Sequence, residues 1–198
     1  MSENNEQVEK LLGDFFERHT AGDREGMNQV LQKIQTMLYS GEVDSTPFKD
    51  YFNNMYTGRS AINVAGMVND YPRESIIREL LQNVFGCDYE ENDIKVMIEF
   101  LDEGQVKLTY NETGFSLEQV FYYLSVGRND GNKEREGRFG LGAKSVFANV
   151  DWFKMRSNNY SLRVVNDGGT LKVRELELTA PQFKHTEIVF ALDEEDQK

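Results

Sequence analysis

The chain has 198 residues, enough for one domain of ordinary size with a buried core, so two unrelated full domains are not expected. Its 34 acidic and 22 basic residues give a formal net charge of −12 with no visible basic stripe, which argues against a nucleic-acid partner. Cys87 is the single cysteine, which excludes an internal disulfide and favours a reduced, cytoplasmic setting. No apolar run approaches the length of a membrane span, so we expect a soluble protein.

The first part of the chain predicts a helical layer. From residue 6 to about residue 56, apolar residues recur at helical spacing, and Gly22 and Gly41 interrupt the pattern. We expect residues 1–60 to form a helical extension that packs on a core formed by residues 61–198.

The middle of the chain predicts one more helix and a β-hairpin. The helix runs from about Arg73 to Phe85, and its apolar residues form one broad stripe. Residues 94–101 and 105–110 are two apolar segments joined by an Asp-Glu-Gly turn, which is typical of a hairpin. The stripe consists of Ile76, Ile77, Leu80, Leu81, Val84 and Phe85.

The rest of the chain predicts two helices and then a meander of strands. Residues 117–125 and about 141–148 have helical patterns, and the polar, glycine-bearing segment 127–137 between them predicts a mobile loop. Helices dominate the first half and strands the second, which predicts an α+β fold with helices against one face of the sheet. The predicted strands are 152–156, 160–165, 171–178 and 187–192.

Glu79 and Asn83 are four residues apart in the predicted helix, so their side chains share one face and can address one ligand. A carboxylate at the margin of a core can act as a base toward a water molecule. Asn83 offers a neutral oxygen, a hard ligand suited to Mg²⁺. A solvated glutamate and a surface amide would give the same two letters, so the pair alone leaves both interpretations open.

Closely spaced glycines precede the predicted helix at 141–148. Such a turn lets backbone N–H groups converge on an anion at a helix N-terminus, although a turn that merely serves helix packing is equally consistent with it. The segment is not a P-loop, because Ala143 separates Gly142 from Lys144 and no buried strand precedes it. It is not a dinucleotide-binding fingerprint either, because its glycine order is inverted.

The segment YNETGFS, residues 110–116, leaves a predicted strand and enters a predicted helix through Gly114. Polar groups fixed at a strand end can accept a hydrogen bond from the exocyclic amine that distinguishes adenine from guanine. An ordinary turn with Ser116 as the helix N-cap is the alternative.

In this order and spacing, the segments ELLQN, YNETGF and GRFGLGAKSVF resemble the motifs of the GHKL ATPase superfamily, which includes gyrase, heat-shock chaperones, histidine kinases and MutL. The resemblance spans about residues 73–192 and is closest to heat-shock-chaperone-like and sacsin-like domains. It implies the Bergerat fold, a two-layer α/β sandwich with a mixed, mostly antiparallel sheet and helices on one face. It also implies binding of ATP or ADP with Mg²⁺.

The resemblance assigns roles to single residues. It implies that Glu79 is the general base for the hydrolytic water, that Asn83 is the Mg²⁺ ligand, and that Asn111 stands where the family has its adenine-reading Asp. Segment 125–137 resembles the ATP lid. Further nucleotide contacts are implied for Gly114, Arg128, Gly137, Gly140, Leu141, Gly142, Lys144 and Thr186.

The resemblance therefore predicts a Mg-ATP-binding domain that slowly hydrolyses ATP to drive lid closure, with further domains or a homodimer partner in a longer protein. One alternative is a non-catalytic nucleotide-sensing or interaction module that uses its N-terminal helices as a partner surface. The other is a histidine-kinase-like phosphotransfer domain. His19 lies in a helical region, but the acidic residue and proline expected after a phospho-acceptor are missing.

Overall fold

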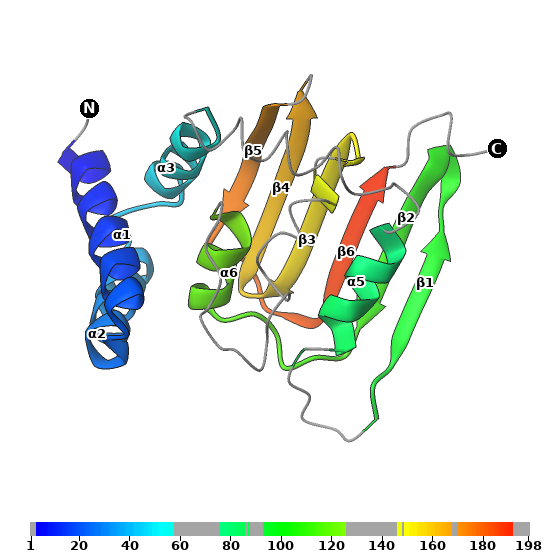
Figure 1. The fold of residues 1–198 in the computed structure, drawn as a ribbon, viewed down its shortest axis with the longest axis horizontal. Helices are drawn as coiled ribbons and strands as arrows, with labels where there is room; N and C mark the ends of the chain where they lie inside the picture. The colour runs from blue at the N-terminus through cyan, green and yellow to red at the C-terminus, as the bar shows by residue number, and fades with distance from the viewer. Residues whose placement is uncertain are drawn as a thin grey trace.

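The protein folds as an α+β structure in which helices cover one face of a six-stranded sheet, as Figure 1 shows. The predicted fold class is confirmed. No described helix is long and apolar enough to cross a membrane. This computed structural model describes residues 3–57, 76–85, 87, 93–125, 146–147, 149–167 and 170–191.

Three helices form the N-terminal layer: α1 (Glu3–Ala21), α2 (Arg24–Tyr39) and α3 (Thr46–Thr57). Gly22 ends α1 with a φ of 73°, a backbone conformation that glycine adopts without steric cost. Asp23 then caps α2, because its side chain accepts a hydrogen bond from the Gly26 N–H at 2.9 Å. The helical pattern predicted for residues 6–56 is confirmed.

The sheet is antiparallel at every described strand pair and has the order β1-β2-β6-β3-β4-β5. The last strand therefore lies between the hairpin and the meander, so the middle of the sheet joins segments far apart in the sequence. The strands are β1 (Val96–Phe100), β2 (Gln105–Tyr110), β3 (Trp152–Asn158), β4 (Tyr160–Asp167), β5 (Thr170–Glu177) and β6 (Phe183–Ala191), and η2 (Asp102–Gly104) joins the first two.

β6 begins four residues before its predicted start at residue 187. The reason is tertiary, because β3 continues to Asn158, which pairs with Phe183 beyond a register shift. Phe183 is followed by a run of polar residues, so the local sequence shows no apolar alternation that would predict this pairing.

Helices α5 (Ile76–Phe85) and α6 (Leu117–Leu124) lie on the same face of the sheet in Figure 1. Ser116 begins α6 with a capping box, in which its hydroxyl accepts from Gln119 N and the Gln119 side chain accepts from Ser116 N. The buried side chains of both helices join those of the sheet in one hydrophobic core.

The N-terminal helices share this core. The ring of Phe121 on α6 lies 5.8 Å from that of Phe15 on α1, and 5.9 Å and 6.0 Å from those of Phe48 and Phe52 on α3. Aromatic rings at these distances add attraction beyond the area that they bury. The helical extension is thus packed on the rest of the molecule through α6.

Candidate functional site

Helix α5 buries the predicted acid–amide pair. Glu79 is 9% exposed and Asn83 is 8% exposed, while the side chain of the neighbouring Arg78 is 72% exposed. The interpretation of these two residues as ordinary solvated side chains is therefore wrong. Arg78 Nη2 lies 3.6 Å from Glu79 Oε1, which is a loose ion pair at the helix surface. The prediction for Phe85 is corrected, because this last residue of the stripe is 63% exposed.

The amide of Asn83 is a buried polar group with no internal partner. Within the described residues its side chain makes no hydrogen bond, and its amide nitrogen is fully enclosed. Nearly all buried polar groups in proteins are hydrogen-bonded, and leaving one unpaired costs about 1–3 kcal/mol. A group held in this condition beside a buried carboxylate fits a site that a polar ligand completes. The residues present are thus compatible with a nucleotide and its Mg²⁺.

The segment after β2 is fixed to β3 by hydrogen bonds. Gly114 has a φ of 90°, and a Cβ at this position would lie 3.0 Å from the Cβ of Asn158. Phe115 N donates to Ser157 Oγ at 2.9 Å, and Asn158 Nδ2 donates to Phe115 O at 3.3 Å. A glycine is therefore required here both by backbone conformation and by the close approach of β3.

Thr186 lies on β6 and is fully buried. Its Cα pairs with that of Tyr110 across β2 and β6, and its hydroxyl shares a short hydrogen bond with Ser157 Oγ. Ser157 thus connects the turn at Gly114 with Thr186, although the two are distant in the sequence. The sequence prediction missed Ser157 because it ended this strand at residue 156; a small polar residue at an inward-facing strand position was the available signal.

The side chain of Asn111 is already engaged by the backbone before β1. Its Oδ1 accepts from Lys95 N at 2.7 Å, and its Nδ2 donates to Asp93 O at 3.0 Å. The amide therefore closes the β1–β2 hairpin at the end opposite its turn. The adjacent Glu112 is 7% exposed, so its carboxylate is enclosed at this strand end.

Tyr123 packs against the turn, because its ring centroid lies 5.5 Å from that of Phe115. Burial raises the pKa of its phenol well above the ordinary value, and the nearby Cys87, Glu112 and Tyr56 raise it further. Cys87 Sγ donates to the backbone carbonyl of Asn83 at 3.1 Å. Cys87 is thus hydrogen-bonded to the end of α5 that carries Asn83.

The remaining predicted contacts lie outside the described residues. These are Arg128, Gly137, Gly140, Leu141, Gly142 and Lys144, together with the predicted lid beyond Ser125. In the described part of the chain, no group of three or more His, Cys, Asp or Glu side chains could hold a metal ion. A Mg²⁺ ion with one protein ligand, its other positions filled by phosphate and water, does not require such a group.

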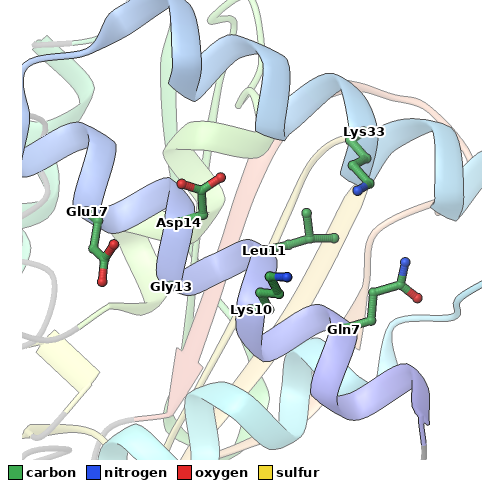
Figure 2. Close-up of a pocket in the computed structure, with 7 residues that line it drawn as sticks. All are labelled: Gln7, Lys10, Leu11, Gly13, Asp14, Glu17 and Lys33. Carbon is green, nitrogen blue, oxygen red and sulfur yellow. The ribbon is translucent and has the colours of Figure 1, made fainter.

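A cleft of about 680 Å³ lies elsewhere, between α1 and α2, and contains none of the predicted site residues. Figure 2 shows six of its lining residues on α1 and Lys33 on α2. Charges of both signs line it, and Asp14 is held by Arg18 at 2.8 Å. The lining is Gln7, Lys10, Leu11, Gly13, Asp14, Glu17 and Lys33.

His19, the residue considered as a phospho-acceptor, packs on the core. Its ring centroid lies 4.9 Å from that of Tyr122, and the side chain is half-buried. This contact accounts for the histidine as a packing residue of α1.

Comparison with known proteins gives a likeness of fold only. No protein-family model matches the chain, and no curated protein matches it. Solved structures do match, among them the crystal structure of the ATPase region of Saccharomyces cerevisiae topoisomerase II, with 13% sequence identity and a TM-score of 0.47. The match covers 60% of this chain and 37% of the topoisomerase chain, so this chain corresponds to well under half of that protein region.

Proposed function

We propose that the chain is a GHKL-type, Bergerat-fold domain that binds ATP or ADP with Mg²⁺ and hydrolyses ATP slowly. The observation that carries this proposal is the buried pair on α5, in which Glu79 is 9% and Asn83 is 8% exposed and the Asn83 amide nitrogen, a donor suited to a polar ligand, has no partner among the described residues. It lies one helical turn from the buried Glu79, in the order and spacing of the motifs described above.

The two buried side chains, Asn83 and Glu79, are proposed to have different roles. Asn83 would hold Mg²⁺ through its amide oxygen, and the bound ion would neutralise charge on the phosphates. Glu79 would accept a proton from the attacking water, since its side chain is buried but 11% of it stays exposed. The glycines at 137, 140 and 142, with Arg128, Leu141 and Lys144, are proposed to surround the phosphates.

At the base end, we assign the acceptor of the adenine amine to Glu112. Both polar atoms of the Asn111 amide are already hydrogen-bonded to the backbone at Asp93 and Lys95. Glu112 follows Asn111 at the same strand end and is 7% exposed. Asn111 then supports the site by fixing the strand end, while Gly114 and Thr186 shape its floor.

Calorimetric titration of the full chain with ATP, with and without Mg²⁺, tests the assignment. We expect Asn83→Ala to weaken Mg-ATP binding by about tenfold or more, because the metal loses its protein ligand. Gln82→Ala, which truncates an exposed amide on the same helix, should bind as wild type does. Glu112→Gln should reduce the preference for ATP over GTP more than Asn111→Asp does. Equal Mg²⁺ dependence in wild type and Asn83→Ala would refute the site.

Hydrolysis is tested separately in the same preparations. Glu79→Gln should keep the affinity for Mg-ATP and lower turnover by about 100-fold or more, since a positioned general base contributes this much. If wild type binds ATP and Glu79→Gln leaves its turnover unchanged, the chain is instead a non-catalytic nucleotide-sensing module.

A further inference from the structure

The two edges of the sheet differ in whether their backbone groups are covered. At the β5 edge, side chains from the N-terminal helical layer cover them. Asn53 on α3 donates from Nδ2 to Val173 O at 3.1 Å and accepts at Oδ1 from Val173 N at 2.8 Å. Ser45 Oγ accepts from Leu178 N at 2.9 Å. In Figure 1 α3 lies beside this edge. Side chains of the helical layer thus take the place of a neighbouring strand.

The β1 edge lies at the other end of the sheet, where β2 is its one described strand neighbour. The N–H groups of Lys95 and Leu101 point toward β2, since they donate to Asn111 Oδ1 and to Gln105 O. Backbone groups alternate in direction along an antiparallel strand, so those of residues 94, 96, 98 and 100 point outward. This row of donors and acceptors is a template for another strand.

The side chains along this edge are apolar and exposed. Phe100 is 80% exposed and Met97 is 51% exposed, and Ile94, Ile98 and Leu101 are each more than a third exposed. Exposed edges are usually blunted by proline, a bulge or several charges. β1 has no proline, and its pairing with β2 runs without a register shift from Val96 to Phe100. A flat apolar edge of this kind favours pairing.

We propose that β1 pairs antiparallel with β1 of a second copy of this chain, with Met97 opposite Met97 on the two-fold axis. This register places Lys95 opposite Glu99 of the second copy, and it does so twice by symmetry. It also places Ile94 opposite Phe100 and Val96 opposite Ile98. Opposite charges and apolar pairs directly across an antiparallel ladder are stabilising.

The neighbouring registers are less favourable. Centring on Val96 places Asp93 opposite Glu99, and centring on Glu99 places two glutamates opposite each other. Centring on Ile98 leaves Lys95 opposite Leu101 and Met97 opposite Glu99. The sequence of β1 is therefore self-complementary in charge at one register, which argues for a second copy over an unrelated strand. The pairing is independent of nucleotide and of the function proposed above.

Sedimentation velocity of the full chain over a concentration series, with and without Mg-ATP, measures the association. Wild type should show a reversible monomer–dimer equilibrium. Lys95→Glu sets like charges opposite each other twice and should weaken the dimer about tenfold. The double variant Lys95→Glu/Glu99→Lys should recover part of this loss, because Glu99→Lys restores the cross-pair but also removes the ion pair of Glu99 with Lys107 at 3.0 Å. Lys33→Glu, which makes the same charge change on α2, should dimerise as wild type does.

Ile98→Pro removes an outward N–H while leaving the hydrogen bonds to β2, so it should abolish the dimer with an unchanged circular dichroism spectrum. Wild type that stays monomeric up to about 1 mM would overturn the proposal, because so weak an interface has no specific register. A double variant as weak as Lys95→Glu, or dimers unaffected by Ile98→Pro, would equally overturn it and would point to another surface.

Discussion

The hydroxyl of Tyr56 joins the N-terminal helical layer to helix α6. It donates to the carbonyl of Leu124 at 2.6 Å, and Tyr56 is 1% exposed. The carbonyls of the last turn of a helix have no partner inside the helix, so this bond satisfies one of them at the end of α6. Burial raises the pKa of the Tyr56 phenol far above its ordinary value, so the hydroxyl stays a donor through the neutral range.

Tyr56→Phe should lower the free energy of unfolding by about 1–3 kcal/mol, because the Leu124 carbonyl is left buried and unpaired. Urea denaturation followed by circular dichroism measures the change. Tyr39→Phe is the matched control, since Tyr39 is 66% exposed, and it should change stability by less than about 0.5 kcal/mol. Equal effects of the two variants would show that the Tyr56 hydrogen bond contributes nothing.

Asn111 and Glu112 show how the contacts in the fold change the interpretation of a single residue. The amide of Asn111 looked like an acceptor for adenine, yet both its polar atoms bind the backbone that leads into β1. Glu112, one position further along, is buried. Strand-end side chains alternate in direction, so a shift of one residue decides which of them is enclosed.

At the scale of elements, the α1–α2 junction depends on one carboxylate. The Asp23 side chain accepts from Gly26 N and pairs with Arg18 Nη1 at 2.8 Å. The backbone hydrogen bond from Gly26, followed by the Arg18 side chain, lowers the pKa of Asp23 below its ordinary value. A carboxyl with a lowered pKa in the folded state stabilises the fold above its unfolded pKa, and this contribution disappears as pH falls through the folded pKa.

Asp23→Asn keeps an N-cap acceptor and removes the charge, so it isolates this effect. The midpoint of thermal unfolding should fall in the variant at neutral pH, and the difference from wild type should shrink between about pH 5 and pH 2. Asp102→Asn in the exposed β1–β2 turn should show no comparable convergence. A wild-type-to-variant gap that is the same at both ends of this range would contradict the assigned ion pair.

The predicted elements agree with the structure where an element buries one face, because its apolar residues then recur with the period of that element. The period of apolar residues gave α1 to α3, the hairpin and α6, and the strands of the meander alternate between buried and half-buried positions as predicted. Phe85 continues the stripe of α5 in sequence but is exposed. Helical spacing defines a stripe but not where along its length the core ends.

At the scale of the whole molecule, the ring of Phe121 on α6 helps to connect the N-terminal helices with the sheet. Phe121 is fully buried and contacts rings from both α1 and α3. The buried residues of the helices and of the sheet belong to one cluster. We therefore expect the chain to unfold as one cooperative unit.

Phe121→Ala should cost about 3–5 kcal/mol of unfolding free energy, because it leaves a cavity at this junction. In wild type, the transitions followed by near-ultraviolet circular dichroism and by hydrogen exchange of α1 should coincide. Phe85→Ala, at an exposed ring, should leave stability within about 0.5 kcal/mol of wild type. Earlier melting of α1 in wild type would show that the layer folds separately.

The sequence by itself determined the local elements, the α+β class, and the spacing that places Glu79 and Asn83 on one helix face. Those properties follow from short-range periodicity and capping, which act within a few residues. The tertiary structure alone decided that both side chains are buried, that Ser157 joins Phe115 to Thr186, and that Asn111 serves the hairpin. These depend on contacts between strands far apart in the chain, and sheet order and register are set by the packing of the whole molecule.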